Sequence, residues 1–507
     1  VLTTYAELDD QGKIADPYRS QKRAKAVEYN PNTGLRVIII TENATGLIKE
    51  SRVKTERSWE ITKNKYNARR VLISAETTDE ANRVVLVTDA TASIDAEGRV
   101  TEEYRKQQKS RADVTNPNTG LTVAVITETA TGLTKLSGVP TLRGPETTIN
   151  RHNSRRVLVE AVTQDAIGRT VLVTTSELDE FGRIPETYRI QAKSKAVQDN
   201  PNTGLKFTMT TEGATGLILT SEVETRAGTE TSANTYNTLR VLTKSVTRGQ
   251  FGNTVLVTTP DLDTDGKVSE PYRGLAQSRA QVVNPNTGFK MVAVSETATG
   301  LILTSEVKTR AGYETTASTY NSLRVLEQSV TKDKDGRIVL LLNAAPYLDN
   351  GRVLKHLRDQ GITKAEEYNP NTYLRRTLTT ETATGLLYGI EIETTAGKET
   401  TSVNYNTLRV ELGSRTENAR GAVILESETY LDHKGRPTDE YGRRTYGQYV
   451  KDQTNVVNGT RDAVDQEMAT GLIWHEALTN EAGTFDIDSR YDSLRRKLSS
   501  TTREPVT

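Results

Sequence analysis

An internal repeat of about 85 residues constrains this sequence more than any other feature. The string Ala-Thr-Gly-Leu occurs six times, and a second marker, a Gly-Lys or Gly-Arg pair two or three residues after an acidic residue, recurs at the same position in each unit, both at intervals of 84 to 86 residues. A third string, Asn-Pro-Asn-Thr, begins at Asn30, Asn116, Asn200, Asn284 and Asn369, and the sixth copy reads Asn455-Val456-Val457-Asn458-Gly459. Three markers with one shared period indicate six copies of one unit, with almost no insertions.

The units are predicted at 1–85, 86–170, 171–254, 255–338, 339–423 and 424–507, as one continuous array. The markers themselves are typical of turns, because Gly adopts positive φ freely and Asn and Asp tolerate it. We therefore predict twelve structural turn glycines. In the second string they are Gly12, Gly98, Gly182, Gly266, Gly351 and Gly435, and in the first string they are Gly46, Gly132, Gly216, Gly300, Gly385 and Gly471.

The segments between these turns are predicted to be β-strands. Leu121–Thr127, Arg83–Thr88 and Thr254–Thr259 are rich in Val, Ile and Thr, whose branched side chains suit a pleated sheet. Helical periodicity is hard to find, and only the stretch after each Tyr-Arg, such as Ser20–Val27, is ambiguous between a helical turn and a polar strand. Six turns in each of six units predict on the order of 36 short strands joined as consecutive hairpins.

This pattern predicts an all-β fold in which an antiparallel hairpin array forms an elongated spiral sheet, a solenoid or a hollow shell. A single unit cannot bury a face, so neighbouring units must stack on one another. Only 35% of the residues are hydrophobic, whereas a solid globule usually has about 45–50%. The low apolar content favours a sheet with one wet face, or a hollow tube.

The run from Gly300 to Leu326 resembles the YD repeat of RHS and teneurin-type proteins. The resemblance rests on a Tyr-Asp-like turn followed by Leu and Arg, and on strands of the form Gly-x-x-Thr-x-Tyr. The matching turns are Tyr491-Asp492-Ser493-Leu494-Arg495, Tyr236-Asn237-Thr238-Leu239-Arg240, Tyr405-Asn406-Thr407-Leu408-Arg409 and the variant His152-Asn153-Ser154-Arg155-Arg156. Asn mostly stands where the family has Asp, and the resemblance extends over essentially the whole chain.

The resemblance implies a long β-sheet that spirals into a hollow shell. In bacterial toxin complexes of this family the shell encloses a toxin, and in teneurins it forms part of an adhesive ectodomain. This chain has no DPxG-type motif of the kind that closes the RHS core, and its 85-residue period is unusually regular. Both features favour an extended scaffold over a toxin capsule.

Sequence motifs for catalysis are absent. The chain contains no Cys, no P-loop, no Gly-x-Ser-x-Gly elbow and no His-Glu-x-x-His motif. Its four histidines, His152, His356, His433 and His475, do not recur at one position of the repeat. We therefore predict that the protein is not an enzyme and uses no cofactor.

One segment is a weak candidate for a Ca²⁺ site. Asp261, Asp263 and Asp265 precede Gly266 in the order Asp-x-Asp-x-Asp-Gly, which matches the start of a calcium-binding loop. The bidentate Glu expected at the twelfth position is missing, and Tyr272 stands there. An Asp-Gly hairpin turn explains the same residues without a metal ion.

Charge bears on the choice of partner. Lys and Arg together number 66, as do Asp and Glu, so the net charge is zero and nucleic acid is not expected as a partner. Basic residues follow each Tyr-Arg and would align into a stripe that could meet an anionic polysaccharide, or could instead protect an edge strand. These residues are Arg19, Lys22, Arg23 and Lys25 in the first unit, Arg105, Lys106, Lys109 and Arg111 in the second, and Arg189, Lys193 and Lys195 in the third. Tyrosines also align between units, as packing at turn corners or as a sugar-stacking ladder, at Tyr66, Tyr236, Tyr320, Tyr405 and Tyr491.

The chain begins with Val1 and in mid-pattern, so we expect a piece of a longer or processed polypeptide. No apolar run approaches the roughly 20 residues that a membrane helix needs. The expected function is a non-catalytic structural or interaction scaffold of a bacterial surface or secreted fibre or sheath. Expected partners are copies of itself, adjacent repeats of a longer chain, a cell-surface polysaccharide or another protein. The alternatives are an RHS-type shell that encapsulates a toxin, and a carbohydrate-binding β-propeller.

Overall fold

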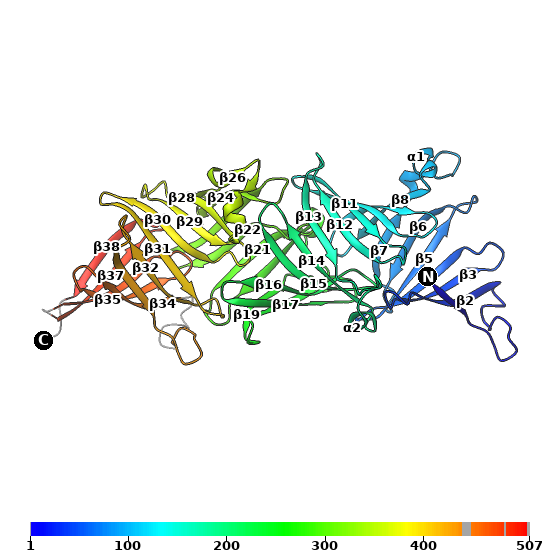
Figure 1. The fold of residues 1–507 in the computed structure, drawn as a ribbon, viewed down its shortest axis with the longest axis horizontal. Helices are drawn as coiled ribbons and strands as arrows, with labels where there is room; N and C mark the ends of the chain where they lie inside the picture. Colours follow the sequence, from blue (N-terminus) through cyan, green and yellow to red (C-terminus); the bar gives the residue numbers. More distant parts are fainter. Residues whose placement is uncertain (1, 439–447, 481–482, 504–507) are drawn as a thin grey trace.

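The protein is a single long antiparallel sheet. The computed structural model describes residues 2–438, 448–480 and 483–503, and within them one sheet contains 36 strands. Successive strands along the chain pair antiparallel, both within units (β8 with β9) and between units (β7 with β8, β13 with β14). The predicted all-β array of consecutive hairpins is therefore confirmed (Figure 1).

The first five units each contribute six strands to this sheet and the sixth contributes five, and the strand β1 (Thr3–Ala6) precedes the first set. The first six are β2 (Arg23–Tyr29), β3 (Arg36–Glu42), β4 (Ile48–Lys54), β5 (Trp59–Tyr66), β6 (Leu72–Thr78) and β7 (Val84–Asp89). After η1 (Thr91–Ser93) and α1 (Glu102–Lys106) come β8 (Lys109–Asn116), β9 (Leu121–Glu128), β10 (Thr134–Thr141), β11 (Gly144–His152), β12 (Leu158–Gln164) and β13 (Thr170–Ser176). After α2 (Glu186–Arg189) come β14 (Lys193–Asn200), β15 (Leu205–Glu212), β16 (Ile218–Thr225), β17 (Gly228–Tyr236), β18 (Leu242–Arg248) and β19 (Thr254–Pro260).

The second half of the chain repeats this order. After η2 (Arg273–Leu275) come β20 (Gln277–Val283), β21 (Lys290–Glu296), β22 (Ile302–Thr309), β23 (Gly312–Tyr320), β24 (Leu326–Asp333) and β25 (Ile338–Asn343). The next segment contains η3 (Ala345–Tyr347), the small hairpin β26 (Leu348–Asp349) and β27 (Arg352–Val353), and α3 (Lys355–Arg358). It leads to β28 (Ile362–Tyr368), β29 (Arg375–Glu381), β30 (Leu387–Thr394), β31 (Gly397–Tyr405), β32 (Glu411–Glu417) and β33 (Val423–Thr429). The last strands are β34 (Gln448–Asn455), β35 (Arg461–Glu467), β36 (Ile473–Asn480), β37 (Gly483–Tyr491) and β38 (Lys497–Arg503).

The segment that the sequence left ambiguous contains both structures. The Tyr-Arg pair lies in a short helical turn, such as α1 or α2, and the basic residues after it begin a strand, such as β2. These strands are polar but half-buried along their length. The helical turn and the loop before it form an excursion from the sheet between the sixth strand of one unit and the first strand of the next.

The sheet winds into an elongated spiral (Figure 1). Glu60 on β5 binds Arg240, which directly follows β17, twelve strands further along the chain. Arg57, just before β5, binds Glu212 at the end of β15, ten strands further along. Each unit therefore contacts its neighbours through strand pairing and the unit two further on through its turns. The sequence predicted only the first kind of contact.

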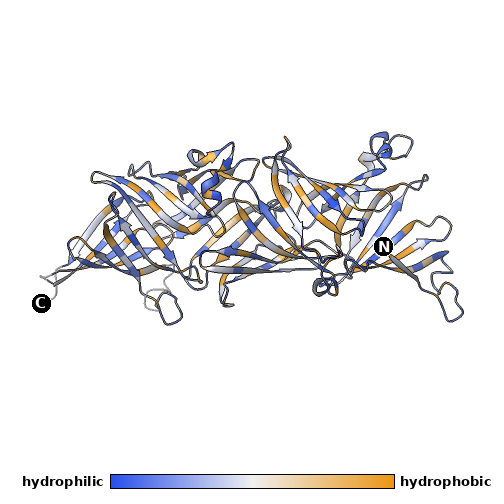
Figure 2. Ribbon diagram, viewed as in Figure 1, coloured by the Kyte–Doolittle hydropathy of each residue, from blue (hydrophilic) through white to orange (hydrophobic). Residues whose placement is uncertain are grey.

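Apolar residues are concentrated where successive turns of the spiral meet. Val85 forms one cluster with Leu239, Val241 and Val268, and Val171 forms another with Leu323, Val325, Val353, Leu357 and Ile362. Both clusters join residues about 150 positions apart. Elsewhere, polar and apolar residues alternate along the strands (Figure 2), as a sheet without one thick core requires.

The spiral is narrow. Twelve strands about 4.8 Å apart span roughly 58 Å, and a typical tilt of about 40° makes one turn of the spiral roughly 24 Å across between backbones. Side chains on facing sheet surfaces take up about 10 Å of such a width. A cavity of about 820 Å³ lies among inward-facing residues of the C-terminal half, including Leu256, Thr316, Ser414 and Val464.

The six units do not form the blades of a propeller, which was one alternative from the sequence. Propeller blades are separate four-stranded sheets around a central channel. Here the last strand of one unit pairs with the first strand of the next, as in β19 with β20 and β25 with β28. Among the described residues, no helix is long and apolar enough to cross a membrane.

Candidate interaction surface at the seam between turns

The markers of the repeat meet along a line where successive turns of the spiral contact each other, which we call the seam. It consists of the hairpin loops and excursions of one unit and those of the unit two further on. Four recurring contacts build it, and each uses a residue at a fixed position of the repeat.

The first seam contact uses the glutamate four residues before each Ala-Thr-Gly-Leu glycine. In Glu212, one carboxylate oxygen accepts the backbone N–H of Glu56 at 2.6 Å and the other accepts the Thr215 hydroxyl. The backbone bond recurs at 2.6 to 2.7 Å in three further pairs: Glu296 with Leu142, Glu381 with Arg226, and Glu467 with Arg310. The glutamate thus fixes its own turn through Thr and the preceding spiral turn through the backbone.

An arginine in the hairpin reinforces this contact. Arg57 pairs with Glu212 and Arg143 pairs with Glu296, and the side chains of both carboxylates are only 5% exposed. Burial raises the pKa of Glu212, but the hydrogen bonds from Thr215, Glu56 and Arg57 outweigh it and hold this pKa below its usual value. In the next two units the arginine lies over an aromatic ring, Arg226 over Tyr388 and Arg310 over Trp474, and Arg310 also pairs with Asp465 at 3.0 Å.

The second seam contact is a bidentate ion pair. Arg240 donates to both carboxylate oxygens of Glu60, with 2.9 Å from Nε to Oε1. The same pair joins Arg324 to Glu146, Arg409 to Glu230 and Arg495 to Glu314, with Nε–Oε1 distances of 3.1, 2.9 and 3.0 Å. The planar guanidinium suits such two-point recognition, which fixes orientation as well as charge.

The third seam contact uses an aspartate at the turn between the fifth and sixth strands. Asp79 accepts Arg83 Nε at 2.9 Å and the hydroxyl of Thr238 at 2.8 Å. Asp165 with Ser322 and Asp333 with Ser493 repeat the contact. The third unit lacks it, because Gly249 and Asn253 replace the Asp and Arg together. Burial raises the pKa of Asp79, but hydrogen bonds from Arg83 and Thr238 lower it below its usual value.

The fourth seam contact is a close backbone approach at the glycine after Asn-Pro-Asn-Thr. A Cβ at Gly34, Gly120 or Gly204 would overlap the carbonyl group of Arg189, Arg273 or Arg358, respectively. These three glycines also have φ between +74° and +77°. Only glycine meets both requirements without strain.

The structure places all twelve predicted turn glycines at positive φ, between +69° and +80°. It also links two markers that the sequence left separate, because the Asn of the Tyr-Asn turn donates its amide to the carbonyl of the glycine about 30 residues later. The pairs are Asn67 with Gly98, Asn153 with Gly182, Asn237 with Gly266, Asn321 with Gly351 and Asn406 with Gly435, at 2.6 to 2.8 Å. An Asp carboxylate could not donate this bond, which explains Asn where the YD motif has Asp.

The three candidate calcium ligands do not converge. Asp261 pairs with Arg279, and Asp263 accepts the backbone N–H groups of Asp265 and Lys267 as a turn cap. Asp265 itself lies 3.5 Å from the Lys267 ammonium. Within the described ranges, no group of three or more Asp, Glu, His or Cys side chains is arranged to hold a metal ion. The segment is used as an Asp-Gly turn.

The remaining candidates are also dispersed. His152 lies on β11, His356 on α3 and His475 on β36, while His433 follows Asp432 in a turn. Basic residues of the predicted stripe pair with carboxylates, as Lys25 does with Glu7, Lys106 with Glu102 and Lys193 with Glu56. Four of the aligned tyrosines, Tyr66, Tyr236, Tyr405 and Tyr491, donate to a backbone carbonyl of their own unit, and the Tyr236 ring also lies under Arg57 of the first unit.

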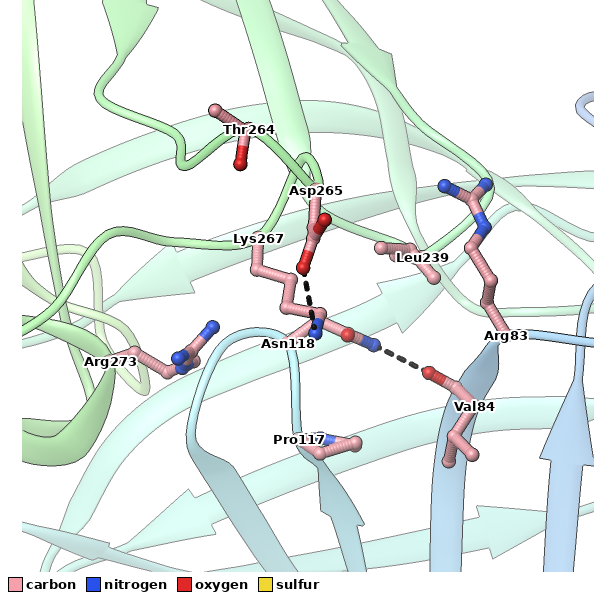
Figure 3. Close-up of a pocket in the computed structure, with 9 residues that line it drawn as sticks. All are labelled: Arg83, Val84, Pro117, Asn118, Leu239, Thr264, Asp265, Lys267 and Arg273. Carbon is pink, nitrogen blue, oxygen red and sulfur yellow. Dashed lines mark hydrogen bonds and ion pairs between the residues drawn. The ribbon is translucent and has the colours of Figure 1, made fainter.

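A cavity of about 730 Å³ lies in the seam (Figure 3). It is bounded by the Asn-Pro-Asn turn at Asn118 of the second unit, by Leu239 of the third unit, and by the Asp-Gly turn at Lys267 of the fourth. Asn118 donates to the carbonyl of Val84, and Arg83 and Arg273 border the cavity from either side (Figure 3). Both arginines are bound to carboxylates, Asp79 and Asp263.

Sequence reasoning identified the turns of the seam but missed its charged residues. The glutamates were detectable, because one stands four residues before the glycine of every Ala-Thr-Gly-Leu copy. They are Glu42, Glu128, Glu212, Glu296, Glu381 and Glu467. A glutamate invariant within one chain, beside a threonine that could cap it, was the available signal.

No protein-family model and no curated protein sequence matches the chain. Among solved structures it is similar to a chain of the TcdB2-TccC3 crystal structure, with 11% identity over 95% of this chain and 29% of that chain, at a TM-score of 0.16. A chain of the TcdB2-TccC3-Cdc42 structure gives 11% identity over 97% and 30%, at 0.15. A porin-like protein from Bacteroides uniformis gives 13% identity over 55% of this chain and 93% of that chain, at 0.19. The chain spans under a third of the TcdB2-TccC3 chains, and TM-scores this low carry no argument about function.

Proposed function

We propose that the protein is a non-catalytic structural scaffold: a β-spiral rod related to YD and RHS repeats, exposed on or secreted from a bacterial cell. The seam carries this proposal. The charged groups that occur at fixed positions of the repeat are used to hold one spiral turn to the next, as in the pairing of Arg240 with Glu60.

The narrow bore argues against the toxin-capsule alternative. A folded domain of 100 residues has a radius of gyration of about 13 Å, so it is more than about 26 Å across. That is wider than the roughly 24 Å between backbones of a twelve-stranded turn, before side chains are counted.

Electron microscopy of the purified chain tests the scaffold. We expect straight rods of uniform width with the elongation seen in Figure 1. Round particles would contradict the proposal. Antibody labelling of intact producing cells tests the location, since a surface or secreted scaffold is accessible without lysis and an internal protein is not.

A further inference from the structure

The two ends of the spiral differ in how well they keep the seam residues. In the third to sixth units, the Ala-Thr-Gly-Leu glutamates bind the preceding turn of the spiral. The equivalent side of the first two units has no preceding turn to contact in this chain. The fifth and sixth units expose the opposite side, which in the first four units contacts the following turn. We compare each exposed position with its buried equivalents inside the spiral.

The N-terminal end keeps the complete set of charged groups. Glu42 and Glu128 correspond to Glu212 and Glu296, and Arg70 and Arg156 correspond to Arg240 and Arg324. The Glu42 and Glu128 side chains are 38% and 37% exposed, against 5% for both interior glutamates. Their closest basic groups are Lys49 and Lys135 of their own hairpins, at 3.8 and 3.7 Å.

The C-terminal end has lost most of the matching groups. Tyr373, with φ of +59° and 80% exposure, replaces the glycine that elsewhere lies against the next turn. Thr395 and Ala396 stand where the hairpins of earlier units carry arginine, and Phe485 replaces the glutamate that binds arginine. Among the fifth and sixth copies of these positions, Glu399 and Gly459 keep their identity.

We propose that the N-terminal end face is a docking surface for a further turn of the same repeat, carried on a neighbouring array whose hairpins bear arginine and glutamate. The chain's own C-terminal face does not fit this surface. Docking there would set Tyr373 against the carbonyl of Arg19, the equivalent of Arg189. It would also leave Arg156 without a carboxylate, because Phe485 stands at that position, and would give Glu42 no arginine. The N-terminal face therefore matches a turn that carries these residues better than it matches the chain's own fifth and sixth units.

The inference rests on the proposed scaffold function, but the two can fail separately. A head-to-tail contact that does not close produces an open filament. Restoring the seam residues at the C-terminal end of the full chain should therefore create one. The variant Tyr373→Gly/Ala396→Arg/Phe485→Glu supplies the missing close approach, an arginine placed like Arg57, and a carboxylate placed like Glu314.

We expect the wild-type chain to sediment as a 55.9 kDa monomer and the triple variant to form filaments along the rod axis. Excess wild-type chain should shorten them, because its N-terminal face joins the filament while its C-terminal face ends it. Adding Glu42→Gln and Glu128→Gln to the triple variant should weaken assembly at least tenfold, whereas Glu97→Gln, in a nearby exposed turn, should not.

Two outcomes would overturn the inference: a triple variant that stays monomeric with an unchanged circular dichroism spectrum and melting temperature, or wild-type chains that stack end to end unaided. Rods seen by microscopy together with a monomeric triple variant would reject the docking surface and leave the scaffold standing. Round particles would reject the scaffold itself.

Discussion

Gly120 and Tyr373 occupy the same position of the repeat and have similar backbones, with φ of +74° and +59°. Gly120 lies against the backbone of Arg273 in the next turn, while Tyr373 is 80% exposed. The turn alone therefore tolerates a large side chain, and the adjacent spiral turn is what imposes glycine. At this position, glycine in the first three units reflects the seam more than the turn itself.

The same difference separates Arg240 from Arg70. Both end a Tyr-Asn turn at positive φ, but Arg240 binds a buried glutamate of the preceding turn and Arg70 is exposed. If the seam holds the spiral together, substitutions at Gly120 and Arg240 should lower the free energy of unfolding strongly. Substitutions at Tyr373 and Arg70 should lower it only slightly.

The largest expected effect comes from removing the seam altogether. Residues 2–176 end with β13 and lack both partners of Arg57 and Glu60, whereas residues 2–343 end with β25 and contain them. We expect the shorter fragment to melt lower by well over about 10 °C, because strand pairing alone must then stabilise it. Equal melting temperatures in a thermal scan followed by circular dichroism would contradict the stacked spiral.

Gly120→Ala tests the close approach between turns. The new Cβ meets the Arg273 carbonyl, so overlap adds about 1–3 kcal/mol to the roughly 1–2 kcal/mol of left-handed backbone strain. Gly46→Ala is the matched control, since Gly46 has φ of +71° and nothing lies within 4 Å of an added Cβ. Urea unfolding should therefore show a loss of about 4 kcal/mol for the first variant.

The control should lose only the strain, about 1–2 kcal/mol. Tyr373→Ala should change stability by less than about 0.5 kcal/mol, as is usual for an exposed residue. Similar losses for Gly120→Ala and Gly46→Ala would show that the turn, and not the seam, requires glycine.

Arg240→Ala tests the ion pair. It leaves Glu60, whose side chain is 2% exposed, as a buried carboxylate without its partner, and breaking such a pair costs about 3 kcal/mol or more. Arg70→Ala removes the same side chain from the same backbone geometry and should cost less than about 0.5 kcal/mol. Comparable losses of unfolding free energy for the two variants would rule out a role for the seam pair.

Acid should weaken the seam through the carboxylates it buries. The pKa values of Glu212, Glu296, Asp79, Asp165 and Asp333 all lie below their ordinary values, because hydrogen bonds outweigh the opposing effect of burial. A lowered pKa in the folded state means that the stabilisation is complete above the unfolded-state values of 4.5 for Glu and 3.8 for Asp, and is lost as the pH falls through the folded values.

Urea unfolding between pH 7 and pH 3 measures this effect. The free energy of unfolding should stay level down to about the unfolded pKa of Glu and then decline. Glu212→Gln should flatten the decline, since one of the titrating groups is gone. A chain equally stable at both ends of this range would show that these carboxylates do not stabilise the fold.

The sequence predicted the sheet well because every local signal agreed on it. Val, Ile and Thr between Gly and Asn turns specify hairpins whatever lies nearby, so strands such as Thr254–Pro260 were identified directly. The winding was not predictable in the same way. It depends on which units meet across a turn of the spiral, and the Glu60–Arg240 pair joins residues 180 positions apart through no periodicity shorter than two units.

The residues of the seam were predicted only in part, because only some of them give a local signal in the sequence. The glycines mark turns, a local property, and were found. The glutamates that bind across the seam resemble any of the 66 acidic residues until a partner is placed beside them. The Asp261–Asp265 segment was ambiguous in the sequence, because turn caps and calcium loops share Asp and Gly at the same spacing.

The smallest expected effect concerns contacts that do not cross the seam. Paired hydroxyls join the fourth and fifth strands of a unit, as in Thr62 with Thr77 in the first unit and Thr401 with Thr416 in the fifth, both at 2.8 Å. Thr62→Val and Thr401→Val should each cost about 1 kcal/mol, because the remaining hydroxyl loses its partner, and replacing both members should be nearly neutral. The cost should be equal in the two units, since neither pair depends on an adjacent turn. Unequal costs in urea unfolding would mean that the spiral ends differ in the sheet as well as at the seam.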